Sequence, residues 1–242
     1  MKWPFRSRIV RHGEPSRPVF ASGSAPSLEA IVKHIKNHIG EPATVLHEIA
    51  SEYVHVDVHV VPPTPDRDFY TLVTSGMSDK PMTAPKQLKG KGLEFAELMF
   101  CLPSSWKLDP YDVVDGETWE KDWPVLWLKK LARFPHEYKT WLSWGHSLPN
   151  GDPAVPFSSA TELCGFVLLE PKLVGDSFKC LVQEDGRKIF FHAAVPVYKE
   201  EMAIKIAEGA EKLEELFAEF GITELVDPNR VNVAGKQKVI RQ

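Results

Sequence analysis

The chain has 242 residues, of which 43% are hydrophobic and 26% are charged, and its formal net charge at pH 7 is −4. This composition is that of a soluble globular protein with one large domain or two small ones. The acidic balance gives no electrostatic support for nucleic-acid binding, and no stretch of sequence approaches the ~18–20 apolar residues needed to cross a membrane. We therefore expect neither nucleic acid nor a membrane among its partners.

The three cysteines, Cys101, Cys164 and Cys180, are far apart and form no CxxC pair. That spacing excludes a zinc ribbon or a thioredoxin-like motif, and it fits a reduced compartment in which cysteines act as small core residues. The N-terminal sequence MKWPFRSRIVRHGEP is basic and lacks the continuous apolar run of a signal peptide. We expect a cytoplasmic protein that uses no cofactor.

The first half of the chain predicts a helix followed by strands. Residues 1–26 mix Arg, Pro, Gly and Ser without a period, which predicts a flexible N-terminal segment. Ser27 can cap a helix with a one-sided apolar stripe, which Gly40 and Pro42 end. Apolar and alternating runs then predict strands at residues 44–49, 53–61, 69–74 and 95–102.

The second half predicts a helix, three strands and a longer helix. Residues 123–134 read as a short buried helix with Pro124 in its first turn. Residues 197–220 predict one long helix, because apolar residues recur in steps of four and three, and Gly221 closes it. Strands are predicted at residues 162–169, 178–183 and 188–195, the last two joined by a tight turn at Asp185-Gly186.

The order of these elements favours one α/β (α+β) domain over residues 27–226, with a mixed, largely antiparallel sheet packed against helices. The tail, residues 227–242, has few apolar anchors and is predicted to be loose or only partly packed.

The sequence HVDVH, residues 55–59, alternates three titratable groups with valines. On a strand, His55, Asp57 and His59 share one face, and the outer two lie ~13 Å apart, so at most two of them can bind one ion. Three interpretations stand: a half-buried strand that turns these groups to solvent, a buried Asp57 that accepts backbone hydrogen bonds, and a metal site whose further ligands come from elsewhere. The first is the ordinary pattern for a strand.

Other motifs fall short of known catalytic patterns. His34 and His38 lie one helical turn apart, but HIKNH lacks the glutamate of HExxH. The stretch TSGMS, residues 74–78, follows a strand and predicts an exposed turn, but it lacks the first glycine of GxSxG. Trp141 and Trp144 lie in a loop-like stretch, where a recognition surface and core packing are both open.

Four motifs together resemble the Suppressor of fused domain family. They are HVDVHVVPPTPDRDFYTLVTSGMSDKPM at residues 55–82, AELM at 96–99 followed by Leu102-Pro103 and Trp106, WPVLWLKKLARFPH at 123–136, and TWLSWGHSLP at 140–149. The resemblance spans about residues 40–220 and implies one α/β domain without catalytic activity. Animal members hold zinc-finger transcription factors inactive by binding them, in part by adding a strand of the partner to a sheet.

Bacterial single-domain members of this family have been proposed as immunity proteins that neutralise toxins, and the compact length here is similar to that branch. Animal members carry Gly-Asp-His before Ser-Trp-His, whereas Lys139-Thr140-Trp141 stands at that place here, so we do not transfer the animal ligand. Ser143, Trp144 and His146 match the family's segment and are candidates for a surface site. With Trp141 from the same loop-like stretch, the candidate binding residues are Ser75, Met77, Asp79, Trp141, Ser143, Trp144 and His146.

We therefore expect a non-enzymatic module that binds and inhibits another protein, with a toxin as one candidate. The alternative is a metal-dependent or acid/base hydrolase that uses His55, Asp57 and His59. A purely structural subunit of a larger complex is a third hypothesis.

Overall fold

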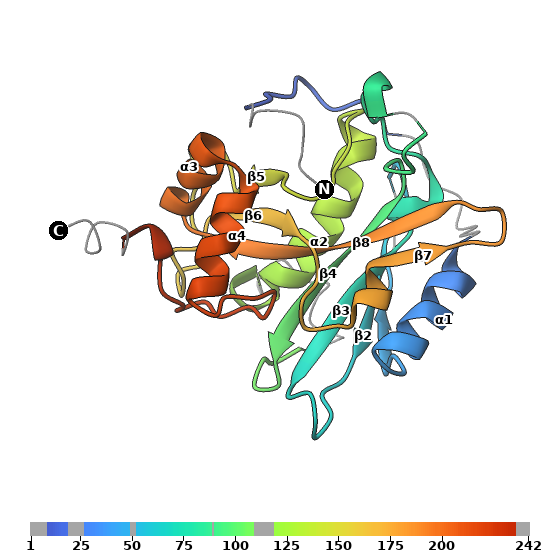
Figure 1. The fold of residues 1–242 in the computed structure, drawn as a ribbon, viewed down its shortest axis with the longest axis horizontal. Helices are drawn as coiled ribbons and strands as arrows, with labels where there is room; N and C mark the ends of the chain where they lie inside the picture. Colours follow the sequence, from blue (N-terminus) through green and yellow to red (C-terminus); the bar gives the residue numbers. More distant parts are fainter. Residues whose placement is uncertain (1–8, 19–26, 49–51, 89, 109–118, 236–242) are drawn as a thin grey trace.

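The computed structural model describes residues 9–18, 27–48, 52–88, 90–108 and 119–235, and these form a sheet with helices on both faces (Figure 1). The strands are β1 Thr44–Leu46, β2 Asp57–Val61, β3 Phe69–Ser75, β4 Ala96–Pro103, β5 Ser147–Pro149, β6 Gly165–Leu169, β7 Cys180–Val182 and β8 Lys188–Val197. Their order is β1-β2-β3-β4-β8-β6-β5, and β7 also pairs with β8. Only the β4–β8 pair among these strands is parallel. The predicted single domain with a mixed, largely antiparallel sheet is confirmed.

The predicted strands exist, with shifted ends. The second begins at Asp57 rather than at residue 53, and the strand predicted at 162–169 begins at Gly165. The predicted turn joins β7 to β8, with Gly186 at a φ of 81°. The three-residue strand β5 was not predicted, because its sequence is too short to show a period.

The helices are α1 Leu28–His38, α2 Trp119–Glu137, α3 Lys199–Glu208 and α4 Ala210–Glu219, with short 3-10 helices at Met77–Asp79, Lys86–Leu88 and Asp176–Lys179. The prediction for α1 is confirmed. The helix predicted to begin at residue 123 begins four residues earlier, so Pro124 lies inside α2 instead of in its first turn. Proline is frequent at the first helical position, and relying on that preference placed the predicted start too close to Pro124.

The prediction of one long helix over residues 197–220 is wrong. The chain turns at Gly209, where φ is 101° and ψ is 167°, and α3 and α4 follow one another as separate helices. Ile206, expected on the apolar stripe, is 39% exposed, whereas Leu213 and Leu216 are buried. The apolar period continues across the break because both helices bury residues in the same core.

Alternate residues of the strands enter two separate cores. On one face, the core joins side chains of β2, β3, β4 and β6 to α2, and it includes Val58, Leu72, Phe100, Phe166, Trp123 and Trp127. On the other face, the core joins the sheet to α1, α3 and α4, and it includes Val61, Val73, Met99, Val195, Ile31, Ile35, Met202, Leu213 and Phe217. Helices on both faces bury the central strands throughout.

The expectation that HVDVH turns its titratable groups to solvent is wrong. Asp57 is 7% exposed and His59 is 2% exposed. The alternation itself holds, since Val58 and Val60 enter the α2-side core, while Val61 enters the core that contains α1. The sequence pattern cannot show that the second face of β2 is also covered.

Both ends of the described chain contact the domain. The Ser16 backbone N–H donates to the Glu137 carbonyl at the end of α2 (2.9 Å), and Tyr53 donates its hydroxyl to the Ser16 carbonyl. Residues 227–235 pack against α3 through Arg230. The remaining parts of the two predicted terminal segments, with residue 49 of the first predicted strand, lie outside the described residues. No helix in the described ranges has the length and apolar character to cross a membrane.

Candidate functional site

The candidate residue Ser75 ends β3, and Met77 and Asp79 lie in the short 3-10 turn that follows it. The sequence predicted an exposed turn, and this is wrong: Ser75 is 2% exposed and Met77 is fully buried. Asp79 is half-buried, and burial raises the pKa of its carboxyl group to about 6. The turn therefore belongs to the interior, and Asp79 is its partly accessible member.

A buried carboxylate from the neighbouring strand holds this turn in place. Glu97 on β4 accepts hydrogen bonds at Oε1 from the Gly76 N–H (3.1 Å), the Ser78 N–H (2.9 Å) and the Ser78 hydroxyl (2.6 Å). Its Oε2 accepts from the Thr74 hydroxyl at 2.6 Å. Glu97 is 0% exposed, and burial raises its pKa to about 7. The turn is thus folded inward around one carboxyl group.

Gly76 permits this close packing. Its φ is 104°, and a Cβ at this position would lie 1.8 Å from the His55 carbonyl oxygen. Glycine is therefore required on two grounds, the backbone conformation and the space. On the other side of the turn, His136 of α2 lies with Nε2 2.8 Å from the Met77 carbonyl oxygen.

The second candidate group lies between α2 and β5. The Trp141 and His146 rings meet edge to face at 4.6 Å. The Ser143 N–H donates to His146 Nδ1 (3.2 Å), and Ser143 is 3% exposed. Burial lowers the pKa of His146 to about 4, with Lys205 nearby acting in the same direction. The His146 imidazole is therefore neutral at physiological pH.

Trp144 and Trp141 point to opposite sides of this loop. Trp141 packs against the core that contains α2, whereas Trp144 packs against the other core. Trp144 also hydrogen-bonds to Glu214 of α4, a bond that opposes the raising of the Glu214 pKa by burial. The Gly145 N–H donates to the Leu168 carbonyl of β6 at 2.6 Å. The loop is therefore wedged between β6 and α4.

The structure brings the two candidate segments next to each other. The Thr83 N–H donates to the Thr140 carbonyl (2.8 Å), and the Leu142 N–H donates to the Met82 sulfur (3.4 Å). The chain that leaves the buried turn thus runs beside the start of the loop that contains Trp141 and Trp144. The binding role of all seven residues stays a prediction.

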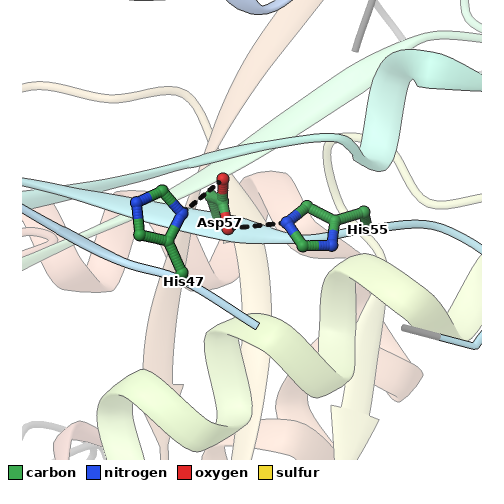
Figure 2. A group of neighbouring side chains, drawn as sticks. All are labelled: His47, His55 and Asp57. Carbon is green, nitrogen blue, oxygen red and sulfur yellow. Dashed lines mark hydrogen bonds and ion pairs between the residues drawn. The ribbon is translucent and has the colours of Figure 1, made fainter. Parts of the chain in front are cut away.

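The predicted trio of HVDVH is only partly assembled. His55 Nε2 lies 3.1 Å from Asp57 Oδ1, so these two residues meet. His59 lies with Nε2 2.9 Å from the Ser75 hydroxyl, and burial lowers its pKa. The third residue beside His55 and Asp57 is His47, which the sequence analysis missed. Its Nδ1 lies 3.1 Å from Asp57 Oδ2 (Figure 2). The antiparallel β1–β2 register places Leu46 opposite Val58. Continuing this register by one residue brings His47 to Asp57, so a correct alignment of the two strands would have identified His47.

A groove of about 260 Å³ opens beside this cluster. It lies between α1 and the edge of the sheet, where β1 is the last strand. Its lining combines apolar side chains with polar ones, and consists of Leu28, Val32, Lys36, Glu41, Pro42, Val45, His47, Asp57 and His59.

Comparisons with known proteins agree on one family. A family sequence profile described as Suppressor of fused protein (SUFU) matches residues 52–231. A SUFU homologue from Neisseria gonorrhoeae FA 1090 shares the fold with a TM-score of 0.59 and 18% identity, over 87% of this chain and 98% of that one. No curated protein sequence matches the chain.

Two further solved structures share the fold. One is a Sufu–Fu complex, with a TM-score of 0.60 and 14% identity over 90% of this chain and 96% of that one. The other is Drosophila Suppressor of Fused, with a TM-score of 0.59 and 14% identity over 92% of this chain and 55% of that one. At these identities the likeness concerns the fold.

Proposed function

The chain belongs to the Suppressor of fused family, and we propose on this basis that it is a non-enzymatic regulator that binds a partner protein and inhibits it. The match over residues 52–231 is the observation that carries the proposal. It is supported by the Sufu–Fu complex, in which a chain of this fold is crystallised with another protein.

The polar groups of the candidate segments support binding rather than catalysis. Glu97 uses both carboxylate oxygens to hold the turn after β3, and it has no exposed surface through which a substrate could reach it. His146 Nδ1 accepts a hydrogen bond from the Ser143 N–H, so one of its two ring nitrogens is engaged within the loop. These groups stabilise a defined surface.

We place the partner contact on the tryptophan loop, residues 141–146, together with β5. This loop offers half-buried aromatic rings, and aromatic side chains supply most of the binding energy at many interfaces. It leads directly into β5, which lies at the end of the strand order. An edge strand can accept an extended segment of a partner.

The hydrogen-bond pattern of β5 supports this placement. The Leu168 N–H donates to the His146 carbonyl and the Asn150 N–H donates to the Cys164 carbonyl, so bonds to β6 fall on even-numbered residues. The backbone groups of Ser147 and the Pro149 carbonyl therefore face away from β6. Proline has no N–H to donate, so it restricts an added strand to a short one.

We include an immunity-type role in the proposal. In such a role the partner is a toxin that the chain binds and inhibits. The match to the Neisseria homologue covers 98% of that chain. An inhibitor of this kind needs a rigid, preformed contact surface, because rigidity lowers the entropic cost of association.

Capture of partners from native lysate tests the proposal. The purified wild-type chain is compared with Trp141→Ala and with Val182→Ala, a control at an exposed edge position on β7 that is 59% exposed. We expect a partner that binds the wild type and the control and is lost about tenfold or more with Trp141→Ala. Circular dichroism verifies that each variant is folded. If no protein is enriched, or all three chains capture the same proteins equally, the proposal fails.

A further inference from the structure

We propose that His47, His55 and Asp57 form a binding site for a divalent transition-metal ion of the zinc class. One ligand atom from each residue lies within 4.8 Å of the other two. The two imidazole nitrogens flank the carboxylate, each 3.1 Å from one of its oxygens (Figure 2). The inference does not depend on the proposed partner binding.

These distances are close to those of a coordinated ion. Ligand atoms placed ~2.0–2.2 Å from a tetrahedral zinc ion lie ~3.3–3.5 Å apart. Each imidazole nitrogen lies 3.1 Å from its own carboxylate oxygen, His47 Nδ1 from Oδ2 and His55 Nε2 from Oδ1. One ligand atom from each of the three residues lies within 4.8 Å of the others, so the ligand atoms must draw closer together around an ion. The His47 side chain is 70% exposed and has room to rotate.

The backbone around the ligands is fixed by contacts beyond them. The Glu48 N–H donates to Asp57 Oδ1 (3.3 Å), and Glu48 Oε2 accepts the Val56 N–H (3.2 Å). From α2, Lys129 donates to the His47 carbonyl (3.1 Å), and Arg133 pairs with Glu48. Outer contacts of this kind orient metal ligands in advance.

The ligand types select the class of ion. Two imidazoles with one carboxylate suit zinc, iron or nickel, whereas calcium and magnesium prefer sites built from oxygen ligands. Three protein ligands leave a fourth position for water or a small anion. His47 and Asp57 line the groove of about 260 Å³, so that position is accessible from solvent. The ammonium group of Lys129 repels a cation here and limits the affinity.

His59 does not belong to the site. It is buried, and its Nε2 is engaged with the Ser75 hydroxyl. The site is therefore made by the residue that follows β1, by His55 before β2 and by the first residue of β2. Binding of an ion would cross-link the end of the edge strand β1 to its neighbour β2.

Metal titration tests the proposal directly. The chain, prepared without a histidine tag and stripped with chelator, is titrated with Zn²⁺ by calorimetry and with Co²⁺ by visible absorption. We expect one equivalent to bind, and the affinity to fall about tenfold or more in His47→Ala, which removes one of three ligands, and in Asp57→Asn, which replaces the anionic ligand with a neutral one. His38→Ala is the matched control, since it removes an exposed histidine that lies four residues after His34.

Three results would overturn the inference. They are the absence of stoichiometric binding to the wild type, unchanged affinity in His47→Ala, and loss of binding in His38→Ala, which would move the ion to α1. His47 is exposed, so His47→Ala decides the matter even if Asp57→Asn fails to fold.

Discussion

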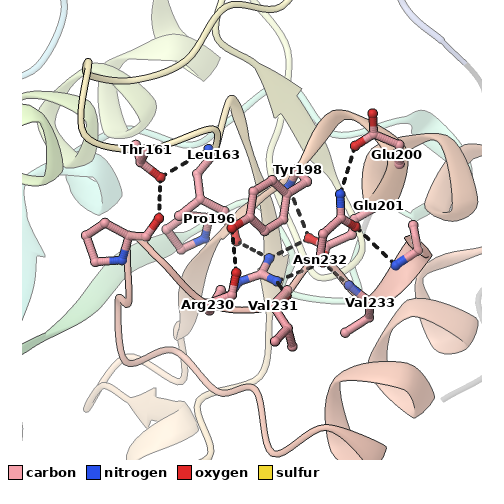
Figure 3. A network of polar contacts seen from close by, with 12 residues as sticks. Thr161, Leu163, Pro196, Tyr198, Glu200, Glu201, Arg230, Val231, Asn232 and Val233 are labelled. Carbon is pink, nitrogen blue, oxygen red and sulfur yellow. Dashed lines mark hydrogen bonds and ion pairs between the residues drawn. The ribbon is translucent and has the colours of Figure 1, made fainter. Parts of the chain in front are cut away.

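Glu201 in the first turn of α3 and Arg230 in the segment after α4 form a bidentate ion pair that is closed to solvent (Figure 3). The Glu201 side chain is 0% exposed and that of Arg230 is 8% exposed. Glu201 also accepts the backbone N–H groups of Tyr198 and Val233, while the guanidinium lies over the Tyr198 and Phe217 rings. This pair joins the segment 227–235 to the domain.

Arg230→Ala is expected to lower the free energy of unfolding by about 3–5 kcal/mol, because it leaves the Glu201 carboxylate buried without its counter-charge. Urea denaturation measures the change. Lys212→Ala is the control: its pair with Glu215 is exposed and should contribute less than about 1 kcal/mol. Equal effects of the two substitutions would show that residues 227–235 are not held by this pair.

Two substitutions of Glu97 should differ in size. Glu97→Ala removes the acceptor for four hydrogen bonds and leaves buried donors unpaired, which should cost about 3 kcal/mol or more. Glu97→Gln keeps one acceptor oxygen for the Gly76 and Ser78 donors and should cost about 1 kcal/mol. Thermal unfolding of the two variants at one pH compares them. A larger loss for glutamine than for alanine would contradict the hydrogen-bond arrangement.

The stability should fall in acid because of His192 on β8. Its burial lowers the pKa from 6.5 to about 4, so the unfolded chain takes up this proton first as the pH falls. As the pH falls from 6.5 to about 4, the free energy of unfolding decreases by up to about 3 kcal/mol. Urea denaturation of the wild type and His192→Leu from pH 7 to pH 4 isolates this contribution. Parallel pH profiles of the two proteins would exclude it.

Gly209→Ala distinguishes two helices from one. In a continuous helix this substitution would stabilise the chain by about 0.8–1 kcal/mol. At the observed φ of 101° it should instead destabilise it by about 1–3 kcal/mol. Gly175→Ala, at a φ of −59°, is the control and should change little. Chemical denaturation gives the sign, and stabilisation by Gly209→Ala would support the single helix.

Local sequence signals were sufficient for much of the fold. The apolar stripe and the residues that end it give α1, and alternating or continuous apolar runs give the longer strands, because these patterns follow from the period of each element. The break at Gly209 escaped detection, since α3 and α4 bury apolar residues in the same core and preserve the period.

The polar contacts were harder to predict because their partners are distant in the sequence. Glu97 looks like an ordinary strand residue, and only the fold of the turn at residues 74–78 gives it four donors. Arg230 looks like a charge on a loose tail, yet its partner Glu201 lies 29 residues earlier. His47 meets Asp57 through strand pairing, which the HVDVH motif alone does not contain.

Gly76 touches two polar centres at once. Its N–H donates to the Glu97 carboxylate, and its Cα packs against the His55 carbonyl where a side chain would not fit. A side chain at position 76 would have to force the turn away from the segment before β2, and the interior carboxyl group would lose a donor in the process.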